Sequence, residues 1–201
     1  MIKQILFDCA GVLAQMRFRD LMLKISGSEE IADYLMTHIW QPDSPWLLYD
    51  KGELNTSAIK AAMRDYMEPA YRTYVETFVD TWMEGLPPME DMEQIVDALH
   101  EKGYRCYLLS NFSERFQEMP RQIPVLNKLD GTVVSYEIHM LKPDTEIFLH
   151  TAKLLGFKPE ETIFVDDTAH NVEGAKKAGM ESYLFTSPAA FRTYLQERGI
   201  L

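Results

Sequence analysis

The segment Thr162-Ile-Phe-Val-Asp-Asp-Thr168 joins a short apolar run to two adjacent carboxylates. The run from Ile163 to Val165 has no polar alternation, which predicts a strand that is buried on both faces. Asp166 and Asp167 follow at its carboxyl end, where open parallel sheets bind their ligands. Adjacent carboxylates repel each other unless a cation offsets their charge, and oxygen ligands suit Mg²⁺. The segment alone predicts either a metal site or an N-cap for the helix that follows.

The surrounding sequence predicts an α/β protein with a Rossmann-like, doubly wound parallel sheet. Short apolar segments alternate with stretches of helical periodicity along much of the chain. The expected strands are residues 4–8, 105–110, 133–136, 162–165 and 182–185, and the expected helices are residues 90–101, 144–155, 171–179 and 189–198. Such alternation implies a parallel sheet with helices on both faces.

A helical insertion is expected after the first strand. From Phe18 onward, apolar residues recur every three or four positions, as on one face of an amphipathic helix. The pattern ends at Pro87 and Pro88, which form a stiff connector. We therefore expect residues 15–87 to form an α-helical module, and residues 1–14 and 88–201 to form the α/β core.

The composition is that of an acidic globular protein. The chain has 201 residues and a formal net charge of −11, so we expect no binding to nucleic acid or to anionic membranes, which need a basic surface. The first apolar run is too short for a signal peptide, and a cytoplasmic location is expected. Cys9 and Cys106 lack the spacing of zinc ligands or of a disulfide framework.

Polar side chains end several of the predicted strands, and one lysine precedes a predicted helix. The residues are Asp8, Ser110, Asn111, Lys142, Asp166 and Asp167. A parallel sheet brings its carboxyl ends together, so these groups are expected at one edge. Their chemistry suits phosphoryl transfer, with a carboxylate nucleophile, a metal between carboxylates, and a hydroxyl, an amide and an ammonium group for the phosphate oxygens. Each residue alone has a plainer interpretation as a turn or surface residue, and it is their order that favours a site.

Four segments resemble the motifs of the haloacid dehalogenase superfamily in order and spacing. They are Phe-Asp8-Cys-Ala-Gly-Val-Leu, Leu-Ser110-Asn, Lys142-Pro and Val-Asp166-Asp-Thr-Ala-His-Asn-Val-Glu-Gly-Ala. The sequence is most similar to the sugar-phosphate phosphatase branch, which is related to the N-terminal phosphatase domain of soluble epoxide hydrolase. The resemblance covers most of the chain and includes a helical cap inserted after the first motif.

The resemblance implies a role for each residue of these motifs. Asp8 would be the nucleophile that becomes an aspartyl-phosphate, and Mg²⁺ would be held by Asp8, Asp167 and the backbone carbonyl of Ala10. Asp166 would lie beside the metal, directly or through water. The phosphate would be bound by Ser110, Asn111 and Lys142. The implied partner is a small phosphorylated molecule, and the oligomeric state is not implied.

The sequence departs from this family at Ala10, where phosphatases usually carry a second aspartate that acts as general acid and base. General acid–base catalysis contributes roughly 10²–10⁴-fold, so its absence predicts selectivity for good leaving groups. The chain is interpreted as a phosphatase of this kind. The alternatives are a catalytically silent binding or regulatory protein and a 2-haloacid dehalogenase-like hydrolase, although the latter would not need the paired Asp166 and Asp167. A Ser/His/Asp hydrolase is disfavoured, because Ser110 lacks a Gly-x-Ser-x-Gly setting.

Overall fold

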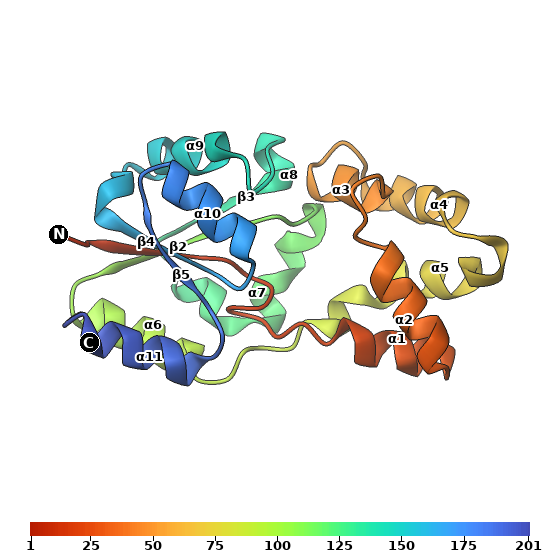
Figure 1. The fold of residues 1–201 in the computed structure, drawn as a ribbon, viewed down its shortest axis with the longest axis horizontal. Coiled ribbons are helices and arrows are strands. Elements are labelled where there is room, and N and C mark those ends of the chain that lie inside the picture. Colours follow the sequence, from red (N-terminus) through yellow and green to blue (C-terminus); the bar gives the residue numbers. More distant parts are fainter.

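Five parallel strands form one sheet in the order β3-β2-β1-β4-β5, in a computed structural model that describes residues 1–201 (Figure 1). The strands are β1 (Gln4–Phe7), β2 (Arg105–Ser110), β3 (Gly131–Val134), β4 (Thr162–Asp166) and β5 (Glu181–Leu184). The central strand β1 pairs with β2 and β4, so that Phe7 lies opposite both Leu108 and Val165. This topology confirms the predicted doubly wound, parallel α/β fold.

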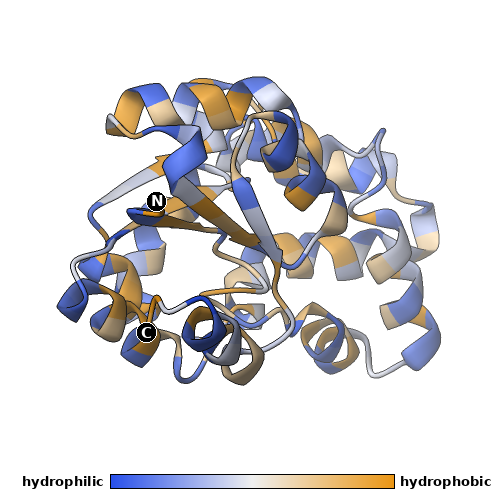
Figure 2. Cartoon of the chain, turned by 60° about the vertical axis from the view of Figure 1, so that its left-hand side comes forward, coloured by the Kyte–Doolittle hydropathy of each residue, from blue (hydrophilic) through white to orange (hydrophobic).

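Helices cover both faces of the sheet because the strands are apolar on both. Ile5 and Phe7 pack toward α6 (Met92–Glu101) and α11 (Pro188–Glu197), and the ring of Phe7 meets that of Phe191 edge-on at 6.0 Å. Leu6 points to the other face, toward α9 (Thr145–Leu155) and α10 (Ala169–Lys177). Figure 2 shows the hydrophobic strands between helices that carry hydrophilic residues on their outer surfaces.

The chain between β1 and α6 is helical and forms the second lobe, at the right of Figure 1. Its helices are α1 (Phe18–Ser26), α2 (Glu29–His38), α3 (Pro45–Asp50), α4 (Thr56–Tyr66) and α5 (Arg72–Thr81). The segments that enter and leave this insert run side by side. The backbone N–H of Gln15 donates to Pro87 at 2.8 Å, and that of Met89 donates to Leu13 at 2.9 Å.

Short helical segments complete the chain. They are η1 (Pro69–Tyr71), η2 (Trp82–Gly85), η3 (Glu114–Glu118), α7 (Met119–Gln122), η4 (Pro124–Lys128), α8 (Ser135–Ile138) and η5 (Pro159–Glu161). One prediction is wrong in detail. Ser135 and Tyr136 belong to α8 and do not extend β3, because the chain turns at Ser135 and its hydroxyl bonds to Phe112 on the neighbouring connection.

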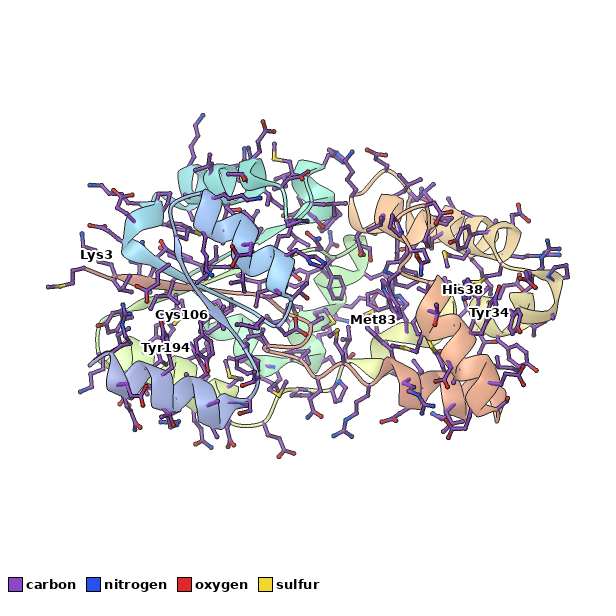
Figure 3. All side chains as sticks on the ribbon, viewed as in Figure 1. Lys3, Tyr34, His38, Met83, Cys106 and Tyr194 are labelled. Carbon is purple, nitrogen blue, oxygen red and sulfur yellow. The ribbon has the colours of Figure 1, made fainter.

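Both lobes share one apolar core. A cluster of 42 buried residues extends from the α6 and α11 face of the sheet into the insert. Aromatic rings join the two lobes, with Trp82 of the insert 5.0 Å from Phe112 at the end of β2. Met83, labelled in Figure 3, lies at this junction. None of the helices combines the length and the apolar character needed to cross a membrane.

Candidate active site

Asp8 lies at the carboxyl edge of the sheet, immediately after β1. Its backbone N–H donates to Val165 on β4 at 2.9 Å, which extends the strand pairing by one residue. The residue is 8% exposed, so its carboxylate is almost removed from bulk water. Burial is the main cause that raises the pKa of Asp8, to about 7, and the nearby charge of Lys142 opposes this rise.

Lys142 joins two carboxylates in the interior of the site. Its Nζ lies 2.7 Å from Oδ1 of Asp8 and 2.8 Å from Oδ2 of Asp166, and its side chain is 1% exposed. An ammonium group has three N–H donors, so one remains for a further acceptor. The two carboxylates act together to raise the pKa of Lys142 and outweigh its burial, which keeps the lysine charged.

Asn111 holds the loop that carries Lys142. Its carboxamide Nδ2 donates to the Lys142 carbonyl at 3.0 Å, and its Oδ1 accepts from the Lys142 backbone N–H at 2.9 Å. Both ends of the carboxamide are therefore engaged, and one N–H of its Nδ2 remains for a further acceptor. Ser110 is buried at the end of β2, beside the connection that follows β1.

Asp166 is saturated with hydrogen bonds from the protein. Besides Lys142, its carboxylate accepts from the backbone N–H of Thr168 at 2.8 Å and from Nδ2 of Asn171 at 3.1 and 3.0 Å. The bond to Thr168 orders the backbone at the start of α10. The N-cap of α10 is Thr168, so the expectation that Asp166 or Asp167 caps this helix is wrong. Asp166 instead orders the residue at the cap and holds the lysine of the site.

Asp8, Asp166 and Asp167 form a carboxylate cluster that fits a hard divalent cation. Each offers an oxygen atom, and these atoms lie within 4.8 Å of one another. Burial and the charge of Asp166 raise the pKa of Asp167, and a cation would relieve this repulsion. The turn after β1 directs its N–H groups to the carbonyls of Cys9 and Ala14, so the carbonyl of Ala10 is left for a ligand. The donor set Asp8, Asp167 and Ala10 is one that Mg²⁺ accepts.

Gly11 makes room for this cluster. Its φ of +87° is in the left-handed region, and a Cβ atom built there would lie 2.2 Å from Oδ2 of Asp167. Only glycine combines this backbone conformation with such a close approach. Gly11 therefore serves both a sharp turn of the backbone and a close approach to Asp167.

The structure adds one acidic residue that the sequence did not indicate. Asp50 ends α3 in the insert, and its carbonyl accepts a hydrogen bond from the hydroxyl of Ser135 in the core. Burial, followed by the charge of Asp8, raises the pKa of Asp50 to about 8. No motif marks Asp50, and Gly52 two residues later is the only local turn signal.

Comparison with known proteins assigns the class of the chain. A family model for haloacid dehalogenase-like hydrolases matches residues 2–179. The chain therefore belongs to this family of hydrolases, and the predicted resemblance is confirmed.

Several curated relatives are phosphatases. Phosphoglycolate phosphatase of Aquifex aeolicus is 25% identical over 192 residues, which cover 91% of this chain and 84% of that protein. Pyrophosphatase PpaX of Bacillus mycoides is 26% identical over 141 residues, which cover 70% of this chain but only 64% of PpaX. Glyceraldehyde 3-phosphate phosphatase of Methanopyrus kandleri is 31% identical over 108 residues, which cover 53% of this chain and 46% of that enzyme. The chain thus spans less than two thirds of the length of the latter two relatives.

Solved structures share the whole fold. A family enzyme from Bacteroides thetaiotaomicron, determined with magnesium and inorganic phosphate, aligns with a TM-score of 0.70 and 26% identity, over 93% of this chain and 96% of that one. L-2-haloacid dehalogenase of Xanthobacter autotrophicus aligns with a TM-score of 0.68 and 19% identity, over 90% of this chain and 76% of that one. At this identity the dehalogenase shows a common fold alone.

Proposed function

We propose that the chain is a Mg²⁺-dependent phosphatase of small phosphate monoesters that works through an aspartyl-phosphate on Asp8. The observation that carries this proposal is the cluster of three carboxylates within 4.8 Å at the sheet edge, with Lys142 inserted between Asp8 and Asp166. The phosphatase relatives and the Bacteroides structure with magnesium and phosphate support it.

The residues of the chain divide the chemistry among them. Asp8 presents the carboxylate oxygen that attacks phosphorus. Its backbone is fixed by a hydrogen bond to β4, and its carboxylate is held by Lys142. The remaining N–H of Lys142 and the hydroxyl of Ser110 bind the phosphate oxygens and orient the ester. Asp8, Asp167 and the Ala10 carbonyl would hold Mg²⁺, which would supply the positive charge that allows a dianion to approach a carboxylate.

We also propose that residues 15–87 act as a cap over this site. The insert follows β1 directly, and its α3 contacts α8 of the core near the carboxyl edge of the sheet (Figure 1). The low exposure of Asp8 agrees with a covered site. A covered site excludes water and strengthens the electrostatic interactions inside it.

The carboxylate cluster also bears on the choice between phosphatase and dehalogenase. Asp167 is partly buried, and its carboxylate forms no ion pair with a cation of the protein. A buried carboxylate without a positive partner is costly, so a reaction that needs no metal would gain nothing from Asp167.

The proposal is tested with a panel of phosphate esters, acyl phosphates and 2-haloacids, assayed with Mg²⁺ and with EDTA. We expect phosphate release that depends on Mg²⁺. Halide release that is insensitive to EDTA would identify a dehalogenase. Binding of Mg²⁺ and phosphate without turnover of any substrate would identify a binding protein, the alternative that the absence of an acid at Ala10 leaves open.

A further inference from the structure

The insert is fixed to the core at the residues that surround Asp50. The hydroxyl of Ser135 donates to the Asp50 carbonyl and accepts from the backbone N–H of Phe112 at 2.9 Å. Nδ1 of His139 lies 3.0 Å from the carbonyl of Lys51. Gly52 packs so closely on α8 that an added Cβ atom would lie 2.4 Å from the carbonyl of Tyr136. These contacts fix the end of α3 above the carboxyl end of β2.

We propose that Asp50 is the proton donor to the leaving group, in place of the aspartate that the chain lacks at Ala10. This inference rests on the proposed phosphatase function and assigns the acid of the same site.

The position of Asp50 suits an in-line displacement. In an in-line displacement the leaving oxygen lies on the side of phosphorus opposite the nucleophile. Asp50 is held over the loop that follows β2, because the Ser135 hydroxyl bonds both to its carbonyl and to the backbone N–H of Phe112. Asp50 does not belong to the cluster formed by Asp8, Asp166 and Asp167, so it does not compete for the metal. It comes from the end of α3 in the insert, whereas Asp8 follows β1 of the core.

The proton transfers balance over the two steps. As Oδ of Asp8 bonds to phosphorus, the ester P–O bond breaks, and the leaving oxygen takes the proton of the Asp50 carboxyl group. Water then attacks the phosphorus of the acyl phosphate and gives its proton to the Asp50 carboxylate. The Asp8–phosphorus bond breaks, phosphate leaves, and both side chains return to their first state.

The surroundings of Asp50 favour its protonated form. Burial is the main cause that raises the pKa of Asp50, to about 8, and the charge of Asp8 adds to it in the metal-free protein. Burial remains when Mg²⁺ offsets the charge of Asp8. The other charged or titratable groups nearby are His139, which contacts the Lys51 carbonyl, and the ion pair of Lys51 with Glu53 at 2.6 Å. The ammonium group of Lys51 is paired with Glu53, so its positive charge does not favour the carboxylate form of Asp50.

The test is a plot of log(kcat/KM) against leaving-group pKa for small phosphate esters. We expect a shallow plot for the wild type and a steep one for Asp50→Asn, with a loss of roughly 10²–10⁴-fold on alkyl phosphates and less than about threefold on an acyl phosphate. The absence of an acid at Ala10 taken alone predicts a steep plot for the wild type, whereas an acid at Asp50 predicts a shallow one. The second variant is Asp50→Asn with Ala10→Asp, in which a new acid at position 10 should restore the alkyl phosphates selectively.

Asp65→Asn is the matched control, because it makes the same change at an exposed carboxylate of α4 in the insert and should leave the plot unchanged. Thermal unfolding verifies that Asp50→Asn folds, and its backbone bond to Ser135 does not need a carboxylate. An equal loss for all leaving groups in folded Asp50→Asn would assign Asp50 a structural role and overturn the inference. An undiminished rate on alkyl phosphates would overturn it as well. A wild type that hydrolyses neither esters nor acyl phosphates would instead overturn the proposed phosphatase function.

Discussion

Gly11 is the residue at which backbone conformation and metal-site geometry depend on each other. We predict that Gly11→Ala weakens Mg²⁺ binding by at least about tenfold, because the new methyl group displaces the Asp167 carboxylate. Isothermal titration with Mg²⁺ measures this loss. Gly103→Ala is the control, since Gly103 has a similar φ of +84° but nothing within 4 Å of its added Cβ. Equal Mg²⁺ affinities in the two variants would contradict the contact between Gly11 and Asp167.

Asp8 makes Mg²⁺ binding depend on pH. Its pKa is raised by burial to about 7, so a proton occupies the carboxyl group of the metal-free protein below that pH. A ligand must lose its proton to bind the ion, and the apparent affinity should fall about tenfold for each pH unit below 7. Titrations at about pH 6 and about pH 8 measure this difference. The same affinity at both values would show that Asp8 does not hold the metal.

Lys142 is the only cation that is paired with Asp8 and Asp166 in the interior. We predict that Lys142→Met lowers the free energy of unfolding by about 3–5 kcal/mol at about pH 8, because it leaves buried charges unpaired.

The loss from Lys142→Met should be smaller at about pH 5. The pKa of Asp8 is already raised in the folded state, and removing Lys142 raises it further. A carboxyl group whose pKa is higher in the folded than in the unfolded state contributes stability that is fully present below the unfolded pKa. This contribution is lost as the pH rises to the folded pKa. Urea denaturation at the two pH values measures the effect. Lys128→Met, which breaks exposed pairs with Glu93 and Asp97, should cost less than about 1 kcal/mol at either pH. A loss from Lys142→Met that does not change with pH would contradict this account.

The elements that follow strong periodic patterns could be predicted from the sequence. β4 was expected at residues 162–165 and is observed at Thr162–Asp166, because an unbroken apolar run between turns has few alternatives to a buried strand. α6 was expected at residues 90–101 and begins at Met92. The positions of Asp8, Asp166 and Asp167 followed from these strands, since a parallel sheet collects its carboxyl ends at one edge.

Short elements could not be predicted in this way. α3 has six residues, which are too few to show a helical periodicity in the sequence, although Ser44 and Pro45 are typical of a helix start. The hydroxyl of Ser44 accepts from the backbone N–H of Trp46, and Pro45 occupies the first turn, as is typical of helix starts. The place of Asp50 depends on how the insert docks on α8, which is a tertiary contact that no local pattern encodes.

At the scale of the whole molecule, the shared apolar core predicts that the two lobes unfold together. All three tryptophans, Trp40, Trp46 and Trp82, lie in the insert, so fluorescence reports on that lobe while far-UV circular dichroism reports on both. Because one cluster of 42 buried residues spans the lobes, we expect both signals to give the same urea midpoint. A fluorescence transition that clearly precedes the circular dichroism transition would show that the insert unfolds on its own.

The central claim is that Asp8 forms a covalent bond to phosphorus during Mg²⁺-dependent hydrolysis. The direct measurement is mass spectrometry of peptides from enzyme that is quenched in acid during turnover of an acyl phosphate. We predict a phosphoryl adduct on the peptide that contains Asp8, present with Mg²⁺ and absent from folded Asp8→Asn, which should also be inactive. Turnover by folded Asp8→Asn, or an adduct that is found only on another residue, would contradict the account.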